Sequence, residues 1–154
     1  MKMALKDHMT KKLITVSLNA PASEARRLMS NFWIRHLPVM DEQEDYIVGM
    51  ISDRDLLGAS STETPVSKLM SSPIKTFDIN TPIKAVVAAM LEEKISAFLI
   101  TKHEDVVGIV TSEDMLVLLN EILGKDEADR WSIMELFSSP AIQRTAYTVS
   151  QAGI

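Results

Sequence analysis

The sequence predicts an α/β fold, of the α+β kind, made of two copies of one small unit in the order strand, helix, strand, strand, helix. Residues 48–57 (VGMISDRDLL) and 107–116 (VGIVTSEDML) have similar sequences, about 60 positions apart. Residues 9–40 also align with residues 70–101, where Met9 matches Met70, Met29 matches Met90, and Asn-x-Pro recurs. A repeat of this period indicates duplication of a supersecondary unit.

In the first copy, residues 13–18 are expected to form a strand. A helix should follow at Asn19-Ala20-Pro21, because proline suits the first turn and asparagine can cap it. Its apolar residues fall on one helical face, and they are Ala22, Ala25, Leu28, Met29 and Phe32. Strands at 37–40 and 46–51 come next, separated by a polar turn. A last helix should begin after Ser52.

The second copy repeats this order. Strands are expected at residues 74–79, 97–101 and 106–110, and a last helix after Thr111. The helix that follows the first of these strands has its apolar residues at i, i+3, i+4, i+7 and i+8, and they are Ile83, Val86, Val87, Met90 and Leu91.

The predicted domain bounds follow from the repeat. The first repeat covers residues 5–60 and the second 66–123, and a Ser-, Thr- and Pro-rich stretch links them at 58–73. A single unit would leave the apolar side of its sheet and helices exposed, so the two should pack as a pseudo-symmetric pair in one module. Residues 126–154 lie beyond the repeat and are expected to form a helical C-terminal tail.

Composition excludes several classes of protein. The chain has 154 residues, 46% of them hydrophobic and 24% charged, which is ordinary for a globular protein. The net charge of −5 argues against nucleic-acid binding, which needs a basic surface. No cysteine is present, and no apolar run approaches the roughly 20 residues of a membrane helix. We therefore expect a cytoplasmic protein that does not bind a membrane.

The repeated motif at residues 48–57 and 107–116 has two compatible interpretations. Ser52 and Asp55, like Thr111 and Asp114, stand three positions apart at the start of a predicted helix, which is the spacing of a capping box. A helix start after a strand is also a site for anions. There, the carboxylate can accept hydrogen bonds from ribose hydroxyls, and the hydroxyl residue can donate to a phosphate.

Two copies of a strand, an Asn-x-Pro helix, two strands and a (Ser/Thr)-x-x-Asp helix resemble a tandem pair of CBS domains, also called a Bateman module. The resemblance covers about residues 5–123. The first copy carries Met9-Thr10, Ile14-Thr15-Val16, Pro21, residues 35–39 (RHLPV) and residues 49–56 (GMISDRDL). The second copy carries Met70-Ser71, Thr76, Pro82, residues 97–100 (AFLI) and residues 108–114 (GIVTSED).

The resemblance implies that adenine nucleotides or related adenosyl ligands bind in clefts between the paired units, with no required cofactor and no metal. Asp55 and Asp114 would hold ribose hydroxyls, and Ser52 and Thr111 would contact phosphate. The family pattern then places the adenine of a first site between Thr15, Val16, His36, Leu37 and Pro38. The adenine of a second site would be flanked by Thr76, Ala97 and Phe98.

The copies differ at positions that affect a phosphate. Arg54, beside Asp55, could help to hold a phosphate, whereas its counterpart in the second copy is Glu113. His36 likewise becomes Ala97. We therefore expect unequal sites, with the first, which contains Asp55, better suited to phosphorylated ligands.

The expected function is that of a regulatory sensor for AMP-, ADP- or ATP-type ligands. The sequence contains no Gly-rich phosphate loop, nucleophile elbow or paired histidine metal motif, so no enzyme activity is expected. Members of the family commonly pair through their helices, which predicts a homodimer that acts on an unknown regulated protein. The alternatives are an adaptor with empty clefts, an S-adenosylmethionine sensor, a small enzyme and a nucleic-acid-binding protein.

Overall fold

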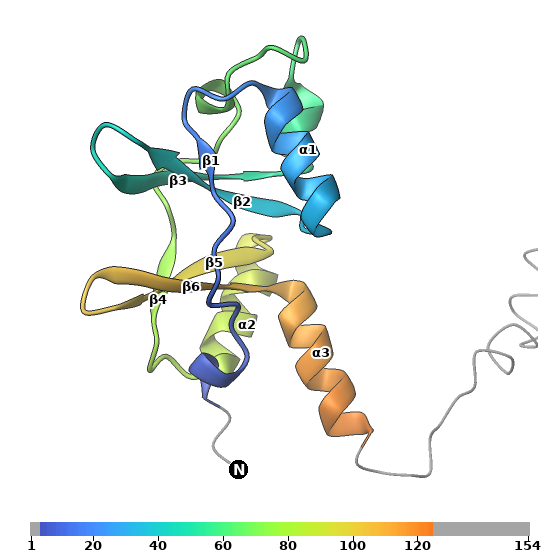
Figure 1. The fold of residues 1–154 in the computed structure, drawn as a ribbon. Coiled ribbons are helices and arrows are strands. Elements are labelled where there is room, and N and C mark those ends of the chain that lie inside the picture. The colour runs from blue at the N-terminus through green and yellow to red at the C-terminus, as the bar shows by residue number, and fades with distance from the viewer. Residues whose placement is uncertain (1–3, 125–154) are drawn as a thin grey trace, which may run out of the picture. The chain divides into compact units, whose positions relative to one another are not determined.

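The computed structural model describes residues 4–124, which form two repeats of mixed α/β structure (Figure 1). The first contains β1 (Val16–Ser17), α1 (Ala22–Phe32), β2 (His36–Asp41) and β3 (Tyr46–Ser52). The second contains β4 (Thr76–Asp78), α2 (Ile83–Glu93), β5 (Ala97–Lys102), β6 (Asp105–Thr111) and α3 (Ser112–Leu123). The predicted fold class and the duplication are confirmed. The tail predicted at 126–154 lies outside the described residues.

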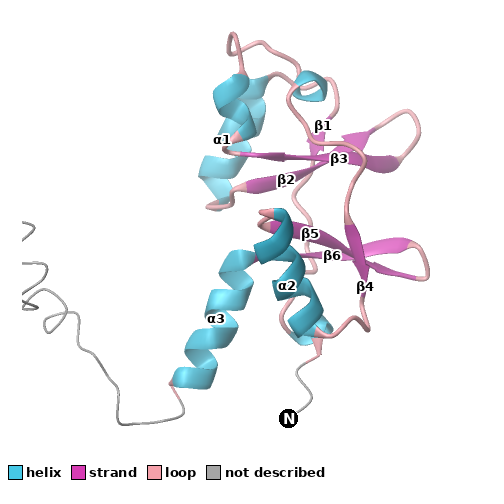
Figure 2. Ribbon diagram, turned by 180° about the vertical axis from the view of Figure 1, so that it is seen from behind, coloured by secondary structure: helices cyan, strands magenta, loops and turns pink. Residues whose placement is uncertain are grey.

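Each repeat has a three-stranded sheet of the same topology. The orders are β1-β2-β3 and β4-β5-β6, with a parallel first pair and an antiparallel hairpin. Even the register shift is repeated, between Val39 and Met40 in one hairpin and between Ile100 and Thr101 in the other. Figures 1 and 2 show the two sheets one above the other, with both hairpin turns on the same side. Both sheets belong to one compact unit that ends at Leu116.

The first repeat departs from the predicted order at its end. The helix expected after Ser52 is only a short 3-10 helix, Asp55–Gly58, whereas its counterpart in the second repeat is α3. Gly58 and the serines that follow it explain the difference, because glycine disfavours helix interiors and serine favours caps and turns.

The linker predicted at 58–73 packs against the first repeat and is not a free spacer. The predicted Asn19 cap is wrong, because Pro21 is the N-cap of α1 and makes no side-chain cap bond. The first amides of α1 instead donate to linker carbonyls, from Ala22 to Thr64 at 2.8 Å and from Ser23 to a second linker carbonyl at 3.0 Å. Val66 of the linker is fully buried in the core of the first repeat.

The segment in front of each repeat pairs with the other repeat. Thr10 and Ile109 of β6 exchange two backbone hydrogen bonds of 2.9 Å. Ser71 and Met50 of β3 exchange two bonds of 2.8 and 3.0 Å in the same way. The strands predicted at 13–18 and 74–79 are therefore too long. Each segment crosses between the sheets before it joins its own, and only its last few residues pair there.

A glycine makes the crossing possible at β3. A Cβ placed on Gly49 would lie 2.7 Å from Met70 Sδ and 2.8 Å from the Ser71 carbonyl oxygen. Cβ atoms essentially never approach other heavy atoms so closely, and the carbonyl is backbone that also pairs with the strand. Only glycine therefore lets the crossing segment lie against β3.

Gly108 has the same role on β6. Its added Cβ would lie 2.8 Å from the Thr10 carbonyl oxygen and 2.9 Å from Met9 Sδ. The glycine and the methionine that recur in both copies of the sequence are thus two sides of one contact. That contact is made between the copies, and not within either of them.

Buried apolar side chains lie in both repeats. One cluster joins β1, α1, β2 and β3 of the first repeat, and another joins Leu99 and Ile109 of the second sheet to Leu13 and Met50 of the first half. The predicted helix faces are buried except at their ends, where Phe32 and Leu91 are 51% and 65% exposed. Within residues 4–124, no helix has the length and apolar character needed to cross a bilayer.

We predict that Gly49→Ala and Gly108→Ala each lower the free energy of unfolding by about 2 kcal/mol, the usual cost of overpacking a tight contact. Urea denaturation followed by circular dichroism measures this. Gly58→Ala is the matched control, because its added Cβ would lie 3.8 Å from the nearest atom, a Leu69 methyl carbon. Equal losses for all three variants would contradict a special role for the crossing.

Candidate functional site

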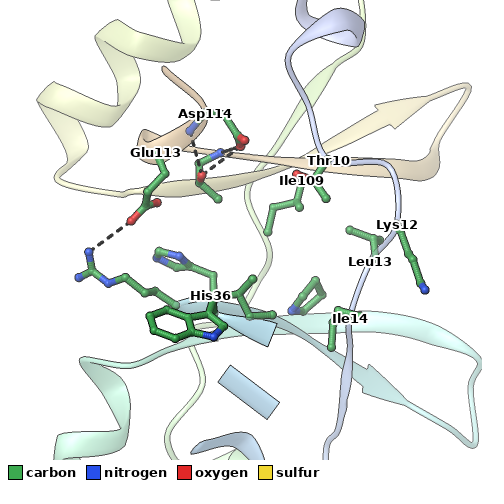
Figure 3. A pocket seen from close by; sticks show the side chains of 13 residues that line it. Thr10, Lys12, Leu13, Ile14, His36, Ile109, Glu113 and Asp114 are labelled. Atoms are coloured by element: carbon green, nitrogen blue, oxygen red, sulfur yellow. Dashed lines mark hydrogen bonds and ion pairs between the residues drawn. The ribbon is translucent and has the colours of Figure 1, made fainter. Parts of the chain in front are cut away.

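The crossing segments create two cavities, each lined by both repeats. The first, here called the Asp114 cavity, has a volume of about 240 Å³. Its wall from the first half of the chain comes from Thr10, residues 12–14, residues 33–36 and Pro38. Ile109, Thr111, Glu113 and Asp114 face them from the second repeat (Figure 3).

The second, here called the Asp55 cavity, has a volume of about 430 Å³. Met50 and residues 52–55 line it from the first repeat. Residues 71–75 and 94–97 line it from the other side. The two cavities are therefore equivalent by the internal repeat, with the roles of the copies exchanged.

This geometry corrects the grouping expected from the sequence. We expected Asp55 to share a site with the first copy's own strands, around Ile14–Val16 and His36–Pro38. Instead, Ile14 and Pro38 line the Asp114 cavity only, and His36 lines both cavities. Apart from Arg35 and His36, Asp55 faces residues from the other side of the crossing, such as Lys75 and Ala97. The crossing is the physical reason, because it carries each leading segment to the opposite repeat.

Most predicted site residues line a cavity. Asp55, Ser52, Arg54, His36 and Ala97 line the Asp55 cavity, and Asp114, Thr111, His36 and Pro38 line the Asp114 cavity. Five others line neither, and they are Thr15, Val16, Leu37, Thr76 and Phe98. Val16, Leu37 and Phe98 are at most 3% exposed. Successive side chains of a strand point to opposite faces, and these three point into the core.

Residues that the sequence analysis did not select also line the cavities, notably Trp33, Arg35, Lys94 and Ser96. Trp33 and Lys94 occupy equivalent positions, each the C-cap of its repeat's first helix and each in the left-handed conformation. Glycine is usual at such a position. A bulky residue directly after each predicted helix was the available signal.

Both aspartates cap their own turn with one oxygen. Asp55 Oδ2 accepts hydrogen bonds from the Ser52 amide and hydroxyl, both at 2.7 Å. Asp114 Oδ2 accepts from the Thr111 amide at 2.7 Å and from its hydroxyl at 3.0 Å. The capping interpretation is therefore confirmed. Among the described residues, Oδ1 of neither aspartate has a hydrogen-bond partner, so each keeps one acceptor for a ligand.

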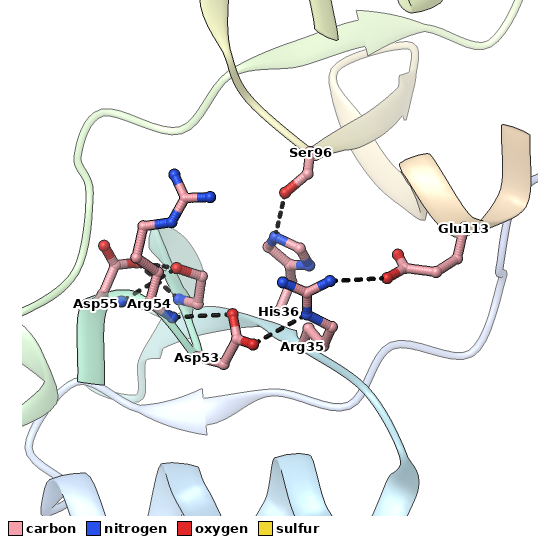
Figure 4. Close-up of polar contacts among 8 residues, drawn as sticks. Arg35, His36, Asp53, Arg54, Asp55, Ser96 and Glu113 are labelled. Carbon is pink, nitrogen blue, oxygen red and sulfur yellow. Dashed lines mark hydrogen bonds and ion pairs between the residues drawn. The ribbon is translucent and has the colours of Figure 1, made fainter. Parts of the chain in front are cut away.

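Arg35 and His36 form a wall shared by the two cavities. The Arg35 guanidinium lies between Asp53 Oδ2 at 2.9 Å and Glu113 Oε1 at 3.4 Å (Figure 4). Nε2 of His36 is hydrogen-bonded to the hydroxyl oxygen of Ser96 at 2.9 Å. The Arg35–Glu113 ion pair and the His36–Ser96 hydrogen bond thus connect two adjacent residues of the first repeat to the second repeat.

Burial and charge set the protonation of this wall. Burial lowers the pKa of His36 below its ordinary value, although the Glu113 and Asp53 carboxylates oppose that shift. Burial also opposes ionisation of Asp53, but the hydrogen bond and charge of Arg35 outweigh it and lower the pKa of Asp53. His36 is therefore neutral at pH 7, and Arg35 and Asp53 are charged.

The side chains around the cavities are suited to binding. Across residues 4–124, no group of three or more histidine or acidic side chains could hold a metal ion. What the cavities offer instead is a carboxylate oxygen, apolar side chains such as Ile14, Pro38 and Ile109, and nearby cations. That combination fits a sugar joined to a flat apolar base.

Comparison with known proteins agrees with this architecture. A sequence model of the CBS domain matches residues 5–62 and 66–121. The CBS domain-containing protein YhcV of Bacillus subtilis is 30% identical over 128 residues, which cover 79% of this chain and 90% of YhcV. Other curated relatives are longer. The chain is 31% identical to L-aspartate semialdehyde sulfurtransferase of Methanocaldococcus jannaschii but spans 22% of its length.

Two solved structures are similar over most of the chain. An uncharacterized conserved protein from Pyrococcus horikoshii is 31% identical, with a TM-score of 0.70, and the match covers 77% of this chain and 93% of that one. The CBS domain pair of protein MJ0100, in complex with 5′-methylthioadenosine and S-adenosyl-L-methionine, is 29% identical, with a TM-score of 0.72 and coverage of 79% and 99%. The chain belongs to the CBS-domain family, and its two repeats form a tandem CBS pair.

Proposed function

We propose that the chain is a regulatory module, and not an enzyme, that binds adenosine-containing ligands in its two cavities and thereby alters its contact with a partner protein. One observation carries this proposal. At each cavity, an aspartate that already caps its own turn keeps an oxygen with no hydrogen-bond partner within residues 4–124, opposite a wall supplied largely by the other repeat. The complex of the MJ0100 CBS pair with two adenosyl compounds supports the ligand class.

The free oxygens suit a ribose. Vicinal hydroxyls are donors, and Oδ1 of Asp55 or Asp114 is a charged acceptor, which makes such hydrogen bonds strong. The hydroxyls of Ser52 and Thr111 already donate their only proton to these aspartates. They would have to release that bond in order to donate to a phosphate, so the cationic side chains are the better phosphate partners.

Phosphorylated ligands such as AMP, ADP and ATP suit the Asp55 cavity best. Arg54, Lys75 and Lys94 line it in addition to the shared Arg35. Lys75 forms an ion pair with Glu93, whereas Arg54 and Lys94 form no ion pair with any described residue. Two uncompensated cations at one cavity attract phosphate.

A ligand in either cavity contacts both repeats at once. It therefore stabilises the arrangement of the repeats in which those contacts are best, which is the requirement for a switch. The exposed surface that a partner or a second copy could cover is apolar, because Leu91 on α2 and Leu116 on α3 are 65% and 63% exposed. We infer a homodimer through these helices.

We predict that Asp55→Asn and Asp114→Asn each abolish binding at one cavity while the fold is retained. The asparagine oxygen can keep the cap, but its amide group replaces the free oxygen and cannot accept ribose hydroxyls. Isothermal titration with AMP, ATP and S-adenosylmethionine should show that each variant loses binding at one cavity, with the affinity of the ligands of that cavity reduced at least tenfold, whereas ligands of the other cavity bind as in the wild type.

Asp41→Asn is the matched control for these variants. Asp41 Oδ1 also accepts a backbone hydrogen bond, from Gln43 at 3.0 Å, but Asp41 lines neither cavity. Its affinities should equal those of the wild type. If no adenosyl compound binds the wild type or raises its melting temperature, the proposal is wrong and an adaptor with empty cavities becomes the better account.

Acidification should remove a contribution of His36 to stability. Because the pKa of His36 is lower in the folded chain than in the unfolded chain, the unfolded chain takes up a proton first as the pH falls. The contribution is complete above about pH 6.5, the unperturbed pKa of histidine, and is lost as the pH falls below that value.

The measurement is the difference in free energy of unfolding between wild type and His36→Gln at pH 7.5, 6.5 and 5.5. The charged groups around His36 are Glu113, Asp53, Arg35 and Asp55, and all are present in both proteins. As the pH falls, we expect the free energy of unfolding of the wild type to decrease relative to that of His36→Gln. A difference that does not change with pH would show that His36 is not held neutral by burial.

The dimer is tested by light scattering after size-exclusion chromatography. The wild type should have the mass of two chains, and the double variant Leu91→Asp, Leu116→Asp should move toward one, because a charge in an apolar interface is costly to desolvate. Tyr46→Asp is the control, since Tyr46 is 54% exposed but lies at the start of β3 and not on a helix. A monomeric wild type would rule out this interface.

A further inference from the structure

The internal repeat allows the two cavities to be compared position by position. The C-cap of α1 is Trp33, which lines the Asp114 cavity, and the C-cap of α2 is Lys94, which lines the Asp55 cavity. Their backbones are nearly identical, with φ of 54° and 58°. One backbone position therefore presents an indole to one cavity and an ammonium group to the other.

At two further pairs of equivalent positions, the Asp55 cavity again has the more positive side chain. The residue before the capping aspartate is Glu113 at the Asp114 cavity and Arg54 at the Asp55 cavity. On the crossing segments, Ile14 at the Asp114 cavity corresponds to Lys75 at the other. At all three pairs, the Asp55 cavity has a cation where the Asp114 cavity has an apolar or an acidic side chain.

The remaining charges do not cancel this difference. Lys12 lines the Asp114 cavity where the other has Pro73, but Figure 3 places Lys12 at the opposite end of the cavity from Glu113. Arg35 belongs to both cavities and is already paired with Glu113 and with Asp53, an acid that lines the Asp55 cavity. Lys75 is paired with Glu93, so Arg54 and Lys94 are the cations of the Asp55 cavity that form no ion pair with a described residue. The Asp114 cavity therefore has an acidic end, where a phosphate would be repelled.

Trp33 is placed to contact a ligand. Trp33 is 95% exposed although it lines the cavity, so little of its apolar surface is used in packing. The left-handed backbone of a bulky residue is uncommon and is found where surrounding structure enforces it. An indole face attracts cations and stacks on flat groups, but unlike Lys94 it carries no positive charge to attract a phosphate.

We propose that the two cavities divide adenosyl ligands by charge, with Trp33 and Glu113 as specificity-determining residues of the Asp114 cavity. The Asp55 cavity takes 5′-phosphorylated adenosine. The Asp114 cavity takes adenosine compounds without phosphate and prefers a positive charge at the 5′ position, such as a sulfonium group. This division rests on the proposed function, because it needs both cavities to bind adenosine.

The first experiment assigns each ligand to a cavity by isothermal titration. In Asp55→Asn, S-adenosylmethionine should bind as in the wild type and AMP should be lost. In Asp114→Asn, the opposite should hold. S-adenosylhomocysteine lacks the sulfonium charge of S-adenosylmethionine, so it should bind the Asp114 cavity several-fold more weakly.

The second experiment exchanges the chemistry of the cavities. In the Asp55→Asn background, Trp33→Lys with Glu113→Arg should bind AMP at least tenfold more tightly and S-adenosylmethionine at least tenfold more weakly. Lys94 shows that a lysine tolerates this backbone position. Glu113→Gln alone should remove the preference for S-adenosylmethionine over S-adenosylhomocysteine. Because Glu113→Gln also breaks the ion pair of Glu113 with Arg35, the same comparison is made in an Arg35→Gln background. It shows whether the change in ligand preference comes from the lost carboxylate or from the freed guanidinium.

The outcomes distinguish this proposal from the one on which it rests. If AMP binds both cavities with equal affinity, or if the exchange leaves both ligands' affinities unchanged, the division by charge is wrong and adenosine binding stands. If none of the three compounds binds the wild type, the proposed function fails, and the division fails with it.

Discussion

The rest of the structure depends on the contact in which the segment leading into each repeat lies against a strand of the other. Thr10 on β6 and Ser71 on β3 each make two backbone hydrogen bonds there, and a glycine beneath each segment leaves the space for it. From that contact, the chain must return to its own sheet. In doing so, it passes across the opening between the sheets, and residues 12–14 and 72–75 become cavity walls.

Local patterns predicted the parts of this fold that depend on local interactions. The spacing of Ile83, Val86 and Met90 predicted a helix face, and these side chains are buried. The crossing could not be predicted in this way. A duplicated sequence is equally compatible with Met70 packing on the glycine of its own copy or on Gly49, and only the second arrangement is found. Long-range pairing leaves no periodicity in the sequence.

At the site, too, residues with a local role could be predicted from the sequence, whereas residues placed by the packing of the repeats could not. The two aspartates could be selected because capping and ligand binding favour the same residue at the same helix start, and each carboxylate has an oxygen for either purpose. Leu37 and Phe98 are buried and line neither cavity, because strand alternation could be predicted from the sequence but not which face of the strand is buried. Trp33 was missed because a residue that ends a helix is usually a glycine with no side chain to place.

Comparison of the copies shows which positions the backbone constrains and which side chains differ between the two cavities. Gly49 and Gly108 are identical because a Cβ would collide with a backbone carbonyl in either copy. The capping aspartates are also identical, and their cap bonds agree within 0.3 Å. Trp33 and Lys94 share a backbone conformation, yet their side chains differ in charge and shape. Stability constrains the backbone at that position but not the side chain, so the difference is best explained by what each cavity binds.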